Sequence, residues 1–256
     1  MEMPFIDVNF DFTTDTPHYW DGFWEGNNGL GSGGNDPDAM SQTLRAYHRA
    51  LWSRELPNGE MMDLSIGRGY EYLTWKNFRF GSDSITASFR YKRYQYMIDQ
   101  VCQTVPNYKE FMERFLRKAY TIGGMIIFPK RRHGSINQNR GCNSQISDRW
   151  DLALECIRKF YLGEESPLYD TLQQEREFFD LFVDFKGYVD FFFLQDCVSP
   201  DYQSVKFWLG NGEFTGNPLP QTVEDYLHWI KESLDFVENR NKRIHEFCIP
   251  EEQHLK

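Results

Sequence analysis

The chain has 256 residues, a net charge of −10 and 17% aromatic residues. This aromatic content excludes a disordered chain, and the longest apolar runs are too short to form a membrane helix. The acidic balance argues against a protein that coats nucleic acids or anionic membranes.

Cysteine use and the first residues indicate the compartment. The five cysteines include no Cys-x-x-Cys pair, which predicts reduced thiols rather than a disulfide framework or a zinc cage. Met1–Pro4 is not followed by the apolar stretch of a signal peptide. We therefore expect a cytoplasmic protein that does not associate with membranes.

The first third of the chain predicts strands around one helix. Apolar residues alternate over 5–12, which is typical of a half-buried strand, and a glycine-rich stretch over 18–34 predicts a loop. Asp36 and Pro37 form a strong helix start, so we expect a helix over 37–54. Small turn residues then separate four short strands of an expected antiparallel meander, over 62–66, 70–75, 78–80 and 84–89.

The remainder predicts mainly helices. We expect these over 92–104, 108–120 with Asn107 as cap, 148–161 with Ser147 as cap, most of 168–196, and 223–246 with Thr222 and Asp225 as a capping-box pair. A short buried strand is expected over 125–128, and a polar loop over 130–146. The prediction is an α+β fold in one compact domain, 1–256, with a strand-rich part over 1–91 and a mainly helical part over 92–256.

Several stretches resemble a family of uncharacterised bacterial proteins. They include Asp36–Asp38, Gly81–Ile85, Tyr120–Gly124, Ile127–Pro129, Ile136–Gln138 with Arg140–Gly141, Asp148–Arg149, Asp151–Leu152, Leu154–Arg158, Asp184–Phe191 and Leu194–Asp196. The resemblance spans nearly the whole chain. It implies a bacterial origin and no assigned reaction.

The expected helix after Ser147 carries the densest set of carboxylates. Helical spacing places Asp148, Asp151, Glu155 and Arg158 along one stripe. The three acids are candidate ligands for Mg²⁺ or Mn²⁺, and Asp151, Glu155 and Arg158 are candidate catalytic residues. The alternative is a solvated or ion-paired helix face, in which Glu155 pairs with Arg158 or Lys159.

The loop before that helix is rich in cations and amides. Lys130, Asn137, Gln138, Arg140 and Arg149 offer donors suited to a phosphate or another anion. The alternative is a loop of ordinary surface cations. Anion donors followed by metal-capable carboxylates favour a small phosphate-bearing ligand.

Three functional hypotheses follow. The first is an enzyme or ligand-binding protein that acts on a nucleotide or another phosphate-bearing small molecule. The second is a non-catalytic module whose aromatic and acidic surfaces bind a partner protein. The third is a ribonuclease toxin that uses Arg240 and His245, which are spaced as in a class of helical ribonucleases.

Overall fold

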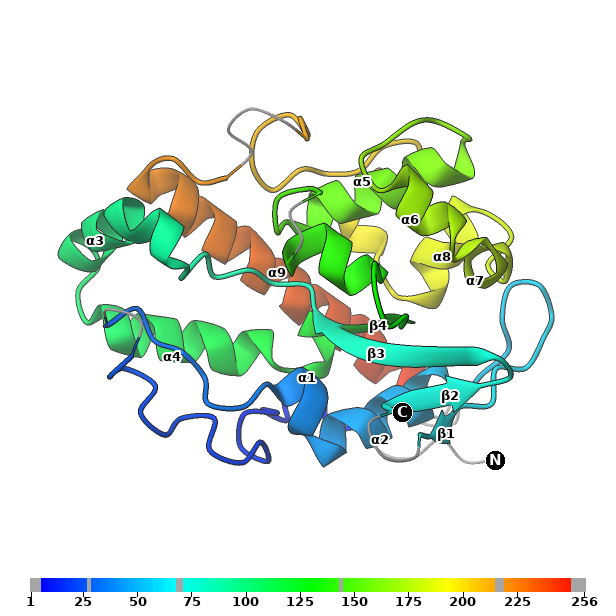
Figure 1. Ribbon diagram of the computed structural model, residues 1–256, viewed down its shortest axis with the longest axis horizontal. Coiled ribbons are helices and arrows are strands. Elements are labelled where there is room, and N and C mark those ends of the chain that lie inside the picture. Colours follow the sequence, from blue (N-terminus) through cyan, green and yellow to red (C-terminus); the bar gives the residue numbers. More distant parts are fainter. Residues whose placement is uncertain (1–5, 27–28, 68–70, 143–144, 215–218, 250–256) are drawn as a thin grey trace, which may run out of the picture.

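The computed structural model describes residues 6–26, 29–67, 71–142, 145–214 and 219–249 and shows an α+β fold (Figure 1). The strands are β1 (Ser65–Ile66), β2 (Leu73–Trp75), β3 (Phe78–Ser84) and β4 (Met125–Pro129). The helices are α1 (Pro37–Met40), α2 (Gln42–Trp52), α3 (Gln95–Thr104), α4 (Tyr108–Ala119), α5 (Trp150–Tyr161), α6 (Tyr169–Gln173), α7 (Arg176–Asp180), α8 (Phe185–Phe191) and α9 (Val223–Cys248).

The four strands form one antiparallel sheet in the order β1-β2-β3-β4. The meander over β1, β2 and β3 confirms the prediction, and β4 joins the far side of β3 by pairing Asp83 with Ile126 and Ser84 with Met125. Every residue of β4 is buried, as its unbroken apolar run predicts.

Two predicted strands are absent, and in each the polar groups of the backbone have other partners. The segment 84–89 leaves the sheet after Ser84, because its backbone carbonyls accept hydrogen bonds from side chains of α9. Trp229 donates to the Ala87 carbonyl, and Tyr226 donates to the Ser88 carbonyl. The segment 6–12 turns instead of extending, because Asp7 and Asp11 accept backbone N–H groups two residues ahead of them. Alternation of apolar residues there reflects packing on the core rather than a strand.

The predicted helix over 37–54 is interrupted at Ser41, which is extended (φ −66°, ψ 118°). Its hydroxyl accepts from the Leu44 amide and caps α2, while the same hydroxyl donates to Asp15. Asp36 caps α1, as predicted. The interruption leaves α1 as a single turn that packs against β3.

The helix α9 organises the helical part. Thr222 and Asp225 form the predicted capping box at its first turn. In Figure 1, α9 crosses the molecule diagonally, and it packs against both α3 and α4. Arg240, near its middle, is fully buried. No helix among the described residues is long and apolar enough to cross a membrane.

Three local predictions differ from the structure in detail. Helix α5 begins at Trp150, with Arg149 extended at the cap position, so Ser147 is not its cap and Asp148 lies outside the helix. Asn107 precedes α4 in a left-handed conformation (φ 54°) and makes no capping hydrogen bond with its side chain. The segment predicted as a polar loop contains one π-helical turn, Gln138–Cys142, which positions Arg140.

Candidate functional site: an acidic pocket

A pocket of about 240 Å³ lies where α1, the end of β3, the end of α4 and the π-helical turn meet. Four carboxylates line it from three separate segments: Asp36 and Asp38 at α1, Asp83 on β3, and Asp148 just before α5. Two guanidiniums and several small or aromatic residues complete the lining: Arg90, Arg140, Ser84, Thr86, Ala87, Ser88, Tyr91, Phe115, Leu116, Ala119, Tyr120, Asn137 and Gly141. The size suits a compact chemical group.

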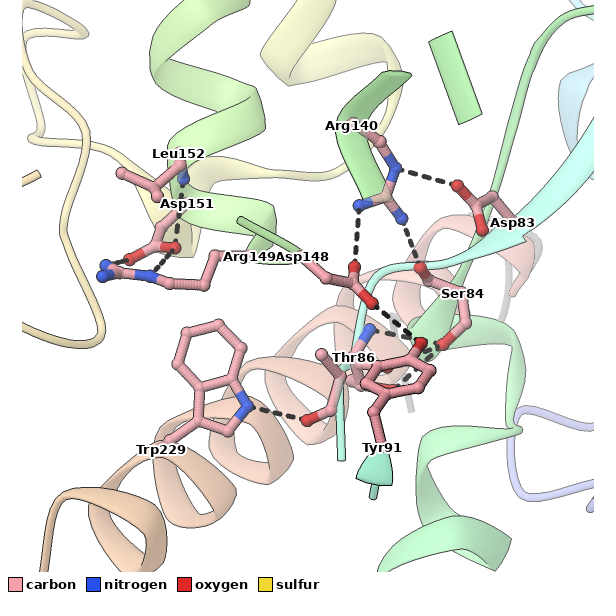
Figure 2. Close-up of polar contacts among 11 residues, drawn as sticks. Asp83, Ser84, Thr86, Tyr91, Arg140, Asp148, Arg149, Asp151, Leu152 and Trp229 are labelled. Atoms are coloured by element: carbon pink, nitrogen blue, oxygen red, sulfur yellow. Dashed lines mark hydrogen bonds and ion pairs between the residues drawn. The ribbon is translucent and has the colours of Figure 1, made fainter. Parts of the chain in front are cut away.

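Arg140 forms the fixed wall of the pocket (Figure 2). Its side chain is 3% exposed, its Nε donates to Asp83 Oδ2 at 2.8 Å, and its Nη2 donates to the Ser84 carbonyl. Its Nη1 lies 3.9 Å from Asp148 Oδ1. Burial opposes the charge of Arg140, but Asp83 and Asp148 outweigh it and raise the pKa of the guanidinium.

Asp38 has a different environment from Asp83. Its Oδ1 accepts from the Ser82 hydroxyl at 2.8 Å, and no cation among the described residues lies within 4.0 Å of it. Loss of hydration, with the charges of Asp36 and Asp83 beside it, raises the pKa of Asp38 well above its usual range. The pocket therefore favours the protonated form of Asp38.

Asp83 titrates near neutrality. Burial raises its pKa to about 6 against the opposing charge of Arg140, and Asp148 adds to the rise. Two carboxyl groups with different environments thus border the same cavity. Such a pair is typical of sites that carry out acid–base chemistry.

Asn137 belongs to the neutral part of the lining. The Nδ2 of Asn137 donates a hydrogen bond to the Ser82 carbonyl, and this bond orients the side-chain amide. The Oδ1 of Asn137 is buried and has no hydrogen-bond partner among the described residues. A buried acceptor without a partner costs free energy unless something donates to it. This oxygen has almost no accessible surface, so Asn137 contributes to the pocket wall rather than to the groups open to a ligand.

Arg149 and Asp151 lie outside this pocket and satisfy each other. They form a bidentate ion pair that is almost completely buried, with side-chain exposures of 2% for Arg149 and 0% for Asp151. Asp151 also accepts the amides of Leu152 and Trp208, and Arg149 donates to the Leu209 carbonyl (Figure 2 shows the Arg149–Asp151–Leu152 contacts). The Arg149–Asp151 pair therefore has a structural role, because it connects the start of α5 to the backbone at Trp208 and Leu209.

Glu155 and Arg158 also pair with each other, through two hydrogen bonds of 2.8 Å. A pair between these two residues is what the ion-paired alternative for that helix face predicts. Asp148 precedes the helix, so the predicted stripe is not formed, and the described residues contain no group of three or more His, Cys, Asp or Glu that could hold a metal ion. The catalytic assignment of Asp151, Glu155 and Arg158 stays a prediction, as does the assignment of Mg²⁺ or Mn²⁺.

The residues predicted to bind an anion do not lie in one site. Asn137 and Arg140 line the acidic pocket, while Lys130 is exposed and lines a separate groove of about 620 Å³ with Arg79, Arg131 and Arg176. Gln138 accepts the amides of Gly134 and Ser135 and so shapes its own loop.

Asp36, Asp38 and Asp83 were not among the predicted site residues. The sequence predicts a helix start at Asp36 and Pro37, assigns no role to Asp38, and places Asp83 between two short strands. All three fall in the stretches Asp36–Asp38 and Gly81–Ile85 that carry the family resemblance. That coincidence is a signal at these positions, but it does not show that the three carboxylates meet.

These features define an α+β protein with a small acidic pocket built around a buried arginine. The chain belongs to a family of unknown function (DUF6994), whose model matches residues 6–244. No curated protein and no solved structure matches the chain.

Proposed function

We propose that this protein is an enzyme that binds a small polar molecule in the acidic pocket and carries out acid–base chemistry on it. One observation supports the proposal above the others: Asp38 and Asp83 border the same cavity, and both have a raised pKa. In this proposal Asp38, whose pKa is raised, and Asp83, whose pKa is about 6, exchange protons with the bound molecule. Arg140 holds Asp83 in place and stabilises charge that develops beside it.

A phosphate in this pocket would meet four carboxylates, and Arg140 is already engaged by two of them. The phosphate-bearing ligand predicted from the sequence fits the Lys130 groove better, because four cations line that groove beside three carboxylates, whereas two cations line the acidic pocket beside four. We retain phosphate binding there as a second candidate function. Titration with inorganic phosphate tests it, and binding should weaken at least several-fold in Lys130→Gln.

Two other hypotheses gain little from the geometry. Arg240 is fully buried and donates to the carbonyls of Phe192, Gly123 and Met125, so it does not share a surface with His245, which is exposed. Most of the aromatic side chains lie in the core rather than on a surface that a partner protein would contact. A ribonuclease site and an aromatic interaction surface are thus less favoured than the pocket.

The reaction can be sought without knowing the substrate. Purified protein is incubated with a small-molecule extract, and mass spectrometry follows which compounds are consumed or formed. The wild type is compared with Asp38→Asn and Asp83→Asn, which keep the shape of the side chain and remove its charge. We expect at least one compound to change with the wild type and to change more than tenfold more slowly with Asp38→Asn.

The matched control is Asp63→Asn, since Asp63 is exposed and does not line the pocket. It should behave as the wild type. Equal conversion by the wild type and Asp38→Asn would remove Asp38 from the proposed mechanism, and the absence of any change would contradict an enzyme of this kind.

A further inference from the structure

We infer that the group held in the acidic pocket is a cation, an ammonium or guanidinium carried by a small molecule. This inference rests on the proposed function and names the class of ligand. It follows from the charges that the pocket leaves uncompensated, from its hydrogen-bonding groups, and from the position of one exposed aromatic ring.

The charges of the pocket are divided unequally. Arg140 compensates Asp83 and Asp148 at one side. Arg90 is held by the carbonyls of Leu30 and Gly31, at 3.4 and 2.7 Å, and its Nε donates to Ser88. At the α1 side, by contrast, no cation in the described part of the chain lies within 4.0 Å of Asp36 or Asp38. A cationic group at this side would favour the ionised form of Asp38 and would compensate its charge.

The hydrogen-bonding groups point to the same chemistry. Asp36 uses Oδ1 to accept the Asp38 amide, and Asp38 uses Oδ1 to accept from Ser82, which leaves a second oxygen on each carboxylate. The guanidinium of Arg140 is committed to Asp83 and Ser84. A ligand that donates several hydrogen bonds matches this lining, whereas an anion offers only acceptors.

Tyr91 adds an aromatic ring to the lining. It is 52% exposed, and its hydroxyl donates to Asp148 Oδ2 at 3.4 Å, which ties the ring to the pocket (Figure 2). Aromatic rings beside carboxylates are typical of sites that bind ammonium and guanidinium groups, because the ring face attracts positive charge. The net charge of −10 attracts the same class of ligand over longer range.

Binding of a cation at Asp38 must be linked to proton release. Without ligand, the raised pKa of Asp38 and Asp83 favours their protonated forms at mildly acidic pH, and a cation favours the ionised forms. Affinity should therefore rise as the pH rises from 5 to 7.5. Among the described residues, the titratable and charged groups around Asp38 are Asp36 on its own helix, Arg45, which contacts the Ala39 carbonyl from α2, Tyr72, Asp83, Arg90, Tyr91, Tyr120, Arg140 and Asp148.

A pair of probes with the same shape and different charge tests the inference. Methylguanidinium and methylurea are titrated separately into the full chain at pH 7.5 and pH 5, and isotope-edited NMR follows the shifts of pocket amides. We expect methylguanidinium to bind at least about tenfold more tightly than methylurea at pH 7.5 and to lose most of this preference at pH 5. Asp38→Asn should abolish the preference, and Asp63→Asn should keep it.

Asp36→Asn is the second variant, because asparagine caps a helix about as well as aspartate and α1 should persist. It too should weaken methylguanidinium binding. Equal binding of the two probes, binding of methylurea alone, or no binding of either would overturn the inference. If Asp38→Asn still slows conversion in the extract experiment, the proposed function survives that failure. Loss of both effects would remove the two proposals together.

Discussion

Arg140 and Arg149 are nine residues apart and equally buried, at 2% exposure each, yet they belong to different kinds of site. Arg149 faces one carboxylate, Asp151, which is itself fully buried and accepts two backbone amides. Arg140 faces Asp83 and Asp148, whose side chains are 23% and 25% exposed and border a cavity. Figure 2 shows the two sites side by side.

The comparison separates a structural ion pair from a candidate ligand site. In the Arg149–Asp151 pair, charges cancel and the carboxylate oxygens have donors within the protein. In the acidic pocket, the lining carboxylates outnumber the guanidiniums. Burial of an arginine is thus uninformative about function by itself. Two properties distinguish the Arg149 pair from the Arg140 site: the balance of charge around the arginine, and the access of solvent to the carboxylates that it contacts.

The largest expected effect is the loss of stability when the closed pair is broken. Asp151→Asn leaves the buried guanidinium of Arg149 without a compensating charge, which costs about 3–5 kcal/mol. For a chain of this size the melting temperature should fall by roughly 10 °C. Thermal unfolding followed by circular dichroism measures it. A fall of about 2 °C or less would show that the carbonyl of Leu209 and the ring of Trp229 suffice to hold Arg149.

Replacing Arg140 should produce a smaller loss that depends on pH. Arg140→Met removes the cation between Asp83 and Asp148, and at pH 7.5 their repulsion should destabilise the fold by about 3 kcal/mol. Near pH 5 the carboxyl groups bind protons and the penalty should shrink. Chemical unfolding at both pH values provides the measurement. A penalty of the same size at pH 5 would mean that Arg140 acts through packing alone.

Asp38→Asn should stabilise the protein at neutral pH. The pKa of Asp38 is raised in the fold, so the folded state binds more protons than the unfolded state, and stability falls as the pH rises through the range between the two pKa values. Asparagine avoids this loss and still accepts from Ser82. We expect the melting temperature to rise by about 2–4 °C at pH 7.5, which corresponds to roughly 1 kcal/mol, and to match the wild type at pH 4. Lower stability at pH 7.5 would indicate that Asp38 is ionised and compensated.

The smallest effect is expected at Glu155 of α5, which is 8% exposed and pairs with Arg158. Glu155→Gln exchanges an ion pair with Arg158 for a weaker hydrogen bond, which should cost about 1 kcal/mol or less, and it should leave methylguanidinium binding unchanged. Calorimetric unfolding and the NMR titration provide the two readouts. Loss of ligand response or of conversion in this variant would restore the catalytic assignment of Glu155 that the sequence suggested.

Sequence patterns predicted much of the fold because they report local chemistry. The capping box at Thr222, the Asp36–Pro37 helix start and the buried run of β4 each depend on residues a few positions apart. The predictions that were wrong depended on distant partners. Ser41 divides a periodic helix by bonding to Asp15, and the segment after Ser84 gives its carbonyls to α9. The single domain over 1–256 stays a prediction.

The sequence by itself determined the α+β class, the family and the presence of acidic and cationic segments next to each other, because composition and short-range spacing are written in the chain. Only the tertiary structure decided which charges meet. Asp38, Asp83 and Arg140 are separated by 45 and 57 residues, as their numbering shows, and converge because α1 packs on β3 and a π-helical turn directs Arg140 toward Asp83. Electrostatic energy depends on distance and burial in space, so the acidic pocket could not be recognised before the fold was known.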